Sequence, residues 1–306
     1  MLGALTARLD RDQALGHLAM LAFSALVAGS FSLGSRSANH IDPAALNAVR
    51  FAGAAAIIGT VAWMSGKLTR RAYAAPWRFL VLGGLLGSYF VLMFEGLKTA
   101  PPVSAAAVFT LTPLLTAGFG YLMLRQRLTG RMAVALGLGA FGALWVIFRG
   151  DPALALRLEI GRGELVYFIG CIAHAAYTPA ARLLNRGESA VGFTFGTLTG
   201  AALLIALFGA PSLLGTDWGA LPGIVWITIL YTAAFASAAT FVLMQFATLR
   251  LPSAKVLAYT YLTPSWVILL ELFATGRAPP AIILLGVALT GSALLLLLRN
   301  DDAGAR

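Results

Sequence analysis

Few residues of this chain could carry chemistry, and those few lie inside long apolar segments. His174 and Tyr177 lie in one segment, and Tyr259, Thr263 and Trp266 lie in another at spacings of four and three. On a helix, these spacings place the last three side chains on one face. Rings beside hydroxyl groups suit a ligand with a ring and polar ends, whereas the competing interpretation is ordinary packing between helices.

A histidine inside an apolar segment has two interpretations. The pKa of a free histidine lies near physiological pH, so His174 could bind a substrate or carry a proton. It could equally be a neutral side chain that forms hydrogen bonds between helices. Faces of similar character occur in other segments. The candidate substrate-binding residues are Ser24, Ser88, Leu92, Phe109, His174, Tyr177, Tyr231, Tyr259, Thr263 and Trp266.

Two prolines, Pro113 and Pro264, lie near the middle of apolar segments. Proline has no N–H, so a helix that contains it leaves a carbonyl four residues earlier without its partner. Exposed backbone at membrane depth is tolerated where it lines a cavity or where protein groups satisfy it. The two prolines therefore predict a pair of kinks that frame a substrate site, or packing kinks with nearby threonines as local partners.

Charged residues inside the apolar segments are scarce. Arg50 and Glu95 are expected at similar depth, where they could form an ion pair that fixes one end of the molecule. The alternative is that Glu95 contacts a substrate ammonium group. Glu271 is expected at the membrane interface. A phosphorylated ligand would require arginine or lysine at the site, so the pattern favours a neutral or zwitterionic one.

The composition excludes an ordinary soluble protein. The chain of 306 residues is 59% hydrophobic and 11% charged, whereas soluble proteins carry about 25% charged residues. A surface that faces lipid removes this difficulty. The net charge of +10 comes from basic clusters between apolar runs, as in loops beside a bilayer, so nucleic acid is not an expected partner. The sequence predicts no cofactor, no metal site and no catalytic residue.

The apolar segments predict an all-α polytopic membrane protein with ten transmembrane helices, since about 20 apolar residues cross a bilayer. Between them lie short connectors that carry Pro, Gly or charge. The expected spans are 14–35, 43–66, 76–97, 102–123, 130–149, 163–184, 190–210, 219–247, 252–273 and 279–298.

The distribution of Lys and Arg predicts the orientation, because these residues are enriched in cytoplasmic loops. One alternate set of connectors, which includes both tails, holds 15 of them, and the opposite set holds six. Both termini are therefore expected in the cytoplasm. Lys255 lies near the cytoplasmic end of its span, where its side chain is expected to reach the interface.

An internal repeat is the most informative feature. Residues 90–113 and 241–264 align without a gap at an offset of 151, with nine of 24 positions identical. The match keeps Pro101 and Pro252 as well as both LTP motifs. Because each repeat holds five spans, an odd number, the two halves are expected to be inverted. Inverted repeats with a binding site at their interface are common in secondary transporters.

With ten spans in two halves, LNAVRF around Arg50 and the paired Thr-Pro motifs, the chain resembles the drug/metabolite transporter superfamily, with EamA-type repeats. More narrowly, it resembles YddG-type exporters of aromatic amino acids. The resemblance implies a central cavity and a bacterial inner-membrane location. The expected regions are an N-tail (1–13), repeat 1 (14–149), a periplasmic connector (150–162), repeat 2 (163–299) and a C-tail (300–306).

The function predicted from these features is export of small neutral or zwitterionic metabolites, amino acids and above all aromatic ones, by alternating access between the halves. Coupling to protons is an open alternative, and the oligomeric state is open. Another cargo class remains an alternative. An intramembrane enzyme is the other function class, but it would require His, Asp or Glu clustered at one depth, and such residues are scattered here.

Overall fold

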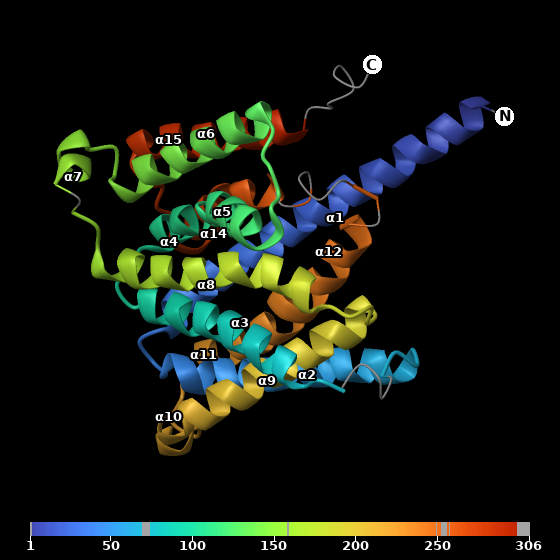
Figure 1. Ribbon diagram of the computed structural model, residues 1–306. Helices are drawn as coiled ribbons and strands as arrows, with labels where there is room; N and C mark the ends of the chain where they lie inside the picture. Colours follow the sequence, from blue (N-terminus) through green and yellow to red (C-terminus); the bar gives the residue numbers. More distant parts are fainter. Residues whose placement is uncertain are drawn as a thin grey trace.

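The computed structural model describes residues 2–68, 74–157, 159–248, 250–251, 256 and 258–298, and every regular element in these ranges is a helix (Figure 1). In chain order the elements are α1 (Leu2–Ser37), α2 (Pro43–Met64), α3 (Trp77–Gly96), α4 (Pro102–Phe109), α5 (Thr112–Leu124), α6 (Gly130–Ile147), α7 (Pro152–Leu156), α8 (Arg162–Leu184), α9 (Ala190–Phe208), α10 (Ala210–Gly215), α11 (Gly223–Ala233), π-helix η2 (Ala234–Ala239), α12 (Thr240–Thr248), 3₁₀-helix η3 (Tyr259–Leu262), α14 (Thr263–Thr275) and α15 (Ala281–Leu298).

Within the described ranges, eight helices are long and apolar enough to cross a membrane. They match eight of the ten expected spans, and the first is continuous with a helix that begins at Leu2. Of the other two expected spans, 163–184 coincides with α8, which has 23 residues but includes Glu164, His174 and Arg182. The remaining one, 252–273, corresponds to η3 and α14. The all-α polytopic fold is confirmed, and the count of ten spans is not fully confirmed.

Two of the long helices are interrupted just before a proline. The α-helix α4 ends at Phe109, and α5 begins at Thr112, with Pro113 in its first turn. In the second half, the 3₁₀-helix η3 leads into α14, whose first turn contains Pro264. Proline at the first turn of a helix is favourable, because the N–H that it lacks would have no helical partner there. Each proline therefore starts a new helix.

The helices pair as expected for two inverted halves. The second helix of one half packs on that of the other (α2 on α9), and the same holds for the fifth (α6 on α15). The third and sixth spans, α3 and α8, pack closely, as do the repeat-related α12 and α1 (Figure 1). This exchange of partners between halves is what a pseudo-two-fold arrangement requires.

Glycines let several helices approach closely. A Cβ atom on Gly96 of α3 would lie 2.6 Å from the carbonyl oxygen of Gly163 in α8. Similarly, a Cβ atom on Gly142 of α6 would lie 2.6 Å from the carbonyl oxygen of Gly286 in α15. Gly200 of α9 faces the backbone of Phe79 in α3. Small residues at crossings are typical of membrane helices, whose association relies on close packing.

Candidate functional site

An aromatic cluster lies where α1, α3, α4 and α8 converge. It contains Phe31, Tyr89, Phe109, Tyr167 and His174. The ring of Phe31 lies 5.9 Å from the rings of both Phe109 and Tyr167, and the hydroxyls of Tyr89 and Tyr167 are hydrogen-bonded at 2.9 Å. Ring separations of 4.5 to 7 Å are those of favourable aromatic pairs. The cluster joins helices of both halves beside the helix break at Phe109.

His174 lies within this cluster. Its ring centroid is 4.4 Å from that of Tyr89 and 5.9 Å from that of Phe109. Its Nδ1 atom is buried and has no hydrogen-bond partner among the described residues. Tyr177, one helical turn further along α8, stacks on His174 at 6.3 Å. A buried polar atom without a partner costs free energy, unless a ligand or water satisfies it.

A second group of the predicted residues lies between α1 and the eighth and ninth spans. The indole Nε1 of Trp266 donates a hydrogen bond of 3.0 Å to Ser24 Oγ. Tyr259 shares a hydrogen bond of 2.8 Å with His17 Nδ1, and Tyr231 donates one to the carbonyl of Leu26. The side chains at Ser24, Tyr231, Tyr259 and Trp266 thus hold α1 against η3, α14 and α11.

Thr263 also lies in the ninth span, and its side chain is fully buried. Its Oγ1 atom has no hydrogen-bond partner in the described part of the chain. Pro264 beside it is buried as well. Pro252 and Lys255, two residues expected in the same span, lie outside the described residues. The structure therefore places an unsatisfied hydroxyl at the second helix break and an unsatisfied imidazole beside the first.

The prediction that Arg50 forms an ion pair with Glu95 is wrong. Arg50 is fully buried, and its Nε and Nη2 atoms donate to Ser237 Oγ at 3.3 and 3.2 Å. Its guanidinium lies 3.9 Å above the ring of Phe90, while Glu95 pairs with Lys98 at 2.6 Å. Arg50 lies about two turns inside α2, whereas Glu95 lies at the end of α3 beside the start of α2, so the two side chains have different neighbours. Arg50 instead connects α2 to the π-helix η2.

The ion pair between α1 and α14 joins Arg36 to Glu271. The Nη2 atom of Arg36 lies 3.2 and 3.3 Å from the two carboxylate oxygens, and Ser32 Oγ donates to Oε1 at 2.5 Å. The pair lies beside a groove of about 380 Å³ between α1, α14 and Tyr231. The two side chains are 34% and 19% exposed.

A second ion pair lies at the opposite ends of the helices and is buried. Arg78 at the start of α3 donates to Glu188 Oε1 at 2.6 Å and to the carbonyl of Leu184 at 2.5 Å. The side chains of Arg78 and Glu188 are 1% and 4% exposed. Burial would raise the pKa of the Glu188 carboxyl. The hydrogen bonds from Arg78 and from backbone N–H groups, including that of Arg186, outweigh it and hold this pKa below its ordinary value.

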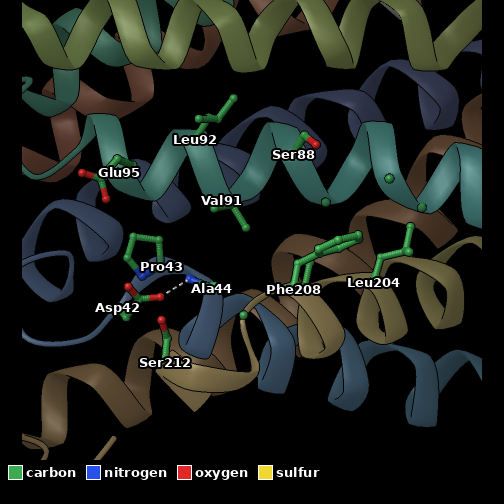
Figure 2. Close-up of a pocket in the computed structure, with 15 residues that line it drawn as sticks. Asp42, Pro43, Ala44, Ser88, Val91, Leu92, Glu95, Leu204, Phe208 and Ser212 are labelled. Atoms are coloured by element: carbon green, nitrogen blue, oxygen red, sulfur yellow. Dashed lines mark hydrogen bonds between the residues drawn. The ribbon is translucent and has the colours of Figure 1, made fainter. Parts of the chain in front are cut away.

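Two candidate residues lie away from both clusters. Ser88 and Leu92 line a groove of about 570 Å³ between α3, the start of α2 and the end of α9 (Figure 2). Ser88 is exposed there. Leu92 also reaches α8, since its Cβ lies 3.1 Å from where a side chain on Gly170 would begin. These two predicted positions are therefore not assembled with His174.

Besides Phe31, three residues of the clusters were absent from the predicted site. Tyr89 and Tyr167 form the hydroxyl pair, and His17 is the partner of Tyr259. A signal existed for two of them. Tyr167 precedes His174 by seven residues, and His17 precedes Ser24 by seven, so each continues a predicted face by two helical turns. Tyr89 carried no such signal.

Comparison with known proteins places this architecture. The EamA-like transporter family matches residues 14–148 and again 161–299, which together cover most of the chain. This chain belongs to the EamA-like transporter family. Each family match covers one of the two halves inferred from the internal repeat. The protein is thus a multi-pass membrane protein of a transporter family.

Two relatives are similar to this chain in sequence. An uncharacterised transporter, YyaM of Bacillus subtilis, is 27% identical over 228 residues, which cover 72% of this chain and 73% of the relative. The aromatic amino acid exporter YddG of Ancylobacter novellus is 28% identical over 210 residues, 67% of this chain and 70% of that protein. A chain of known crystal structure is similar in fold, with a TM-score of 0.66 at 20% identity, covering 94% of this chain and 96% of that one.

Proposed function

We propose that this protein exports small neutral or zwitterionic metabolites, and aromatic amino acids above all, across a bacterial inner membrane. The observation that carries the proposal is the aromatic cluster at the helix break. Five aromatic rings from four helices gather where α4 ends at Phe109, and the Nδ1 atom of His174, one of these rings, has no hydrogen-bond partner among the described residues. The relative from Ancylobacter novellus exports aromatic amino acids, which supports the same cargo class here.

The chemistry of the cluster fits such a cargo. Aromatic rings favour stacked or edge-to-face contact with another ring. The unpaired imidazole nitrogen and the break at Phe109 offer polar groups for an ammonium or a carboxylate. Apart from His174, the cluster contains no acidic or basic side chain, which disfavours a phosphorylated cargo. Export then requires the two halves to alternate in opening the cluster to each side of the membrane, with both termini in the cytoplasm.

Flux of labelled phenylalanine in proteoliposomes tests the proposal. We expect saturable flux in the native protein, and Phe109→Ala should lower it about fivefold because one ring contact contributes about 1 kcal/mol. Phe141→Ala is the matched control, since Phe141 is 56% exposed on α6, and it should leave flux unchanged. Absence of protein-dependent flux of phenylalanine, tryptophan and tyrosine would overturn the proposal.

His174 provides a test of proton coupling. We propose that this side chain contacts the cargo, and that it carries a proton if transport is coupled. His174→Gln keeps a hydrogen-bonding group but cannot titrate near neutral pH. Coupling predicts that an imposed pH gradient drives accumulation in the native protein and that His174→Gln abolishes this dependence. Equal accumulation with and without a gradient would indicate facilitated diffusion.

A further inference from the structure

A groove on α3 has features that the transport site does not use. It lies where α3, the start of α2 and the end of α9 diverge. Figure 2 shows Asp42, Glu95 and Ser212 together at one end of it, and Leu204 and Phe208 at the other. Phe208 is 81% exposed, so this side of α9 faces lipid in a membrane. The groove is therefore amphipathic and open toward the bilayer.

Glycines of α3 keep the groove empty of protein side chains. Gly83 meets the backbone of α9, where the two helices cross. Beyond the crossing, a Cβ atom on Gly84 would lie 3.4 Å from Leu204, and one on Gly87 would lie 3.1 Å from Ile205. From Gly83 to Glu95 the helix rises about 18 Å, close to half of the roughly 30 Å hydrocarbon core. The groove has the length of one leaflet.

Charged groups surround the polar end. Asp42 is exposed, caps α2 through Oδ1, which accepts from the N–H of Ala44 at 2.8 Å, and forms no ion pair with any described residue. Glu95 Oε2 lies 2.6 Å from Lys98 Nζ. This end is where α2 begins and α3 ends, so it lies at the membrane interface. It presents two carboxylates and one ammonium group.

We propose that the groove binds a phospholipid whose headgroup carries a primary amine, as phosphatidylethanolamine does. One acyl chain lies along the glycines of α3 and against Leu204. The lipid ammonium meets Asp42 and Glu95, and the phosphate lies toward Lys98. A primary ammonium donates hydrogen bonds to carboxylates, as that of lysine does, whereas a choline headgroup has no N–H to donate. An anionic headgroup would meet two carboxylates.

Lipid retention measured by native mass spectrometry tests this site. The purified protein is titrated with phosphatidylethanolamine, phosphatidylcholine and phosphatidylglycerol of identical acyl chains. We expect about tenfold stronger retention of the ethanolamine lipid, the effect of one charge-assisted hydrogen bond. Asp42→Asn should reduce the preference to within about twofold while the helix cap is kept, because asparagine caps helices as well as aspartate does.

A second variant tests the acyl chain. Gly84→Leu places a side chain in the groove and should reduce retention of all three lipids about fivefold. Gly118→Leu is the control, since a Cβ atom there would have no neighbour within 4 Å. The proposal is overturned by equal retention of ethanolamine and choline lipids, by an unchanged preference in Asp42→Asn, or by displacement of the lipid by free phenylalanine, which would assign the groove to the cargo. Lipid retention is measured without transport, so its outcome is independent of the proposed function.

Discussion

Two repeat-related interfaces are built differently. One joins α3 to α8, and the other joins the eighth span (α11, η2 and α12) to α1. In the first, backbones touch, since Gly96 and Gly163 each lie against the carbonyl oxygen of the other. In the second, side chains connect the helices. The ring of Tyr231 covers Gly29, and its hydroxyl donates to the carbonyl of Leu26.

The difference indicates which interface can rearrange. Backbone contacts leave no room for one helix to slide or rotate on the other, because packed interiors resist even small displacements. Side-chain contacts can change by rotation about χ angles, at little cost to the helices. Beside Tyr231 lies a groove of about 380 Å³. We therefore expect α1 to move against the eighth and ninth spans during transport, while α3 and α8 stay together.

Substitutions in the two ion pairs, Arg78–Glu188 and Arg36–Glu271, should give the largest difference between the two interfaces. Removal of one partner from a buried pair costs about 3 to 5 kcal/mol, so Arg78→Gln should strongly lower the free energy of unfolding. Arg36→Gln removes a pair whose side chains are 34% and 19% exposed, and exposed pairs contribute about 0 to 1 kcal/mol. Thermal unfolding in detergent measures both. Equal losses of unfolding free energy in the two variants would contradict the expectation that the interface between α3 and α8 is the rigid one.

Glycine substitutions test the same contrast through packing. Gly163→Ala directs a methyl group at the backbone of Gly96, which cannot yield, and should cost about 3 kcal/mol. Gly29→Ala directs one at the tip of the Tyr231 side chain, which can rotate away, and should cost about 1 kcal/mol or less. The melting temperatures of the two variants give the answer. A larger loss for Gly29→Ala would reverse the comparison.

The pH dependence of stability should report on Glu188. Its pKa is lower in the folded protein than the ordinary value of 4.5, so its contribution is complete at neutral pH. This contribution is lost as the pH falls below about 4.5 and through the lowered folded-state pKa. Melting temperatures between pH 7 and 3 should fall less steeply in Glu188→Gln than in the native protein. Parallel curves would show that the ion pair does not govern acid stability.

Hydroxyl deletions give the smallest expected effects. Tyr89→Phe leaves the buried hydroxyl of Tyr167 without this partner and should cost about 1 kcal/mol. Tyr231→Phe removes a hydrogen bond to a helical carbonyl that has a second donor, so about 0.5 kcal/mol is expected. Chemical or thermal unfolding of both variants distinguishes the two costs. A greater loss in Tyr231→Phe would place more stability in the α1 interface than its geometry indicates.

The sequence predicted the architecture well because apolar length and proline are local signals. The expected span 43–66 matches α2 (Pro43–Met64), and the all-α class and the family resemblance are confirmed. The side-chain partners were less accessible. Arg50 and Glu95 were expected at similar depth, yet Arg50 lies inside α2 and bonds to Ser237, while Glu95 lies at the end of α3 and pairs with Lys98. Tyr89 could not be identified because a single sequence does not say which helix lies against that face.

The π-helix from Ala234 to Ala239 also bears on tolerance to insertion and deletion. In an α-helix each residue is rotated by about 100° from the one before it. A deletion in α11 would therefore rotate the part of the helix on one side of the deletion away from its packing neighbours. A π-turn holds an extra residue, and removal of one residue within Ala234–Ala239 would leave an α-helix with both flanks still in register. Ser237, which accepts hydrogen bonds from Arg50, lies in this segment. This segment is therefore where the length of the eighth span could change during evolution without refitting its partners.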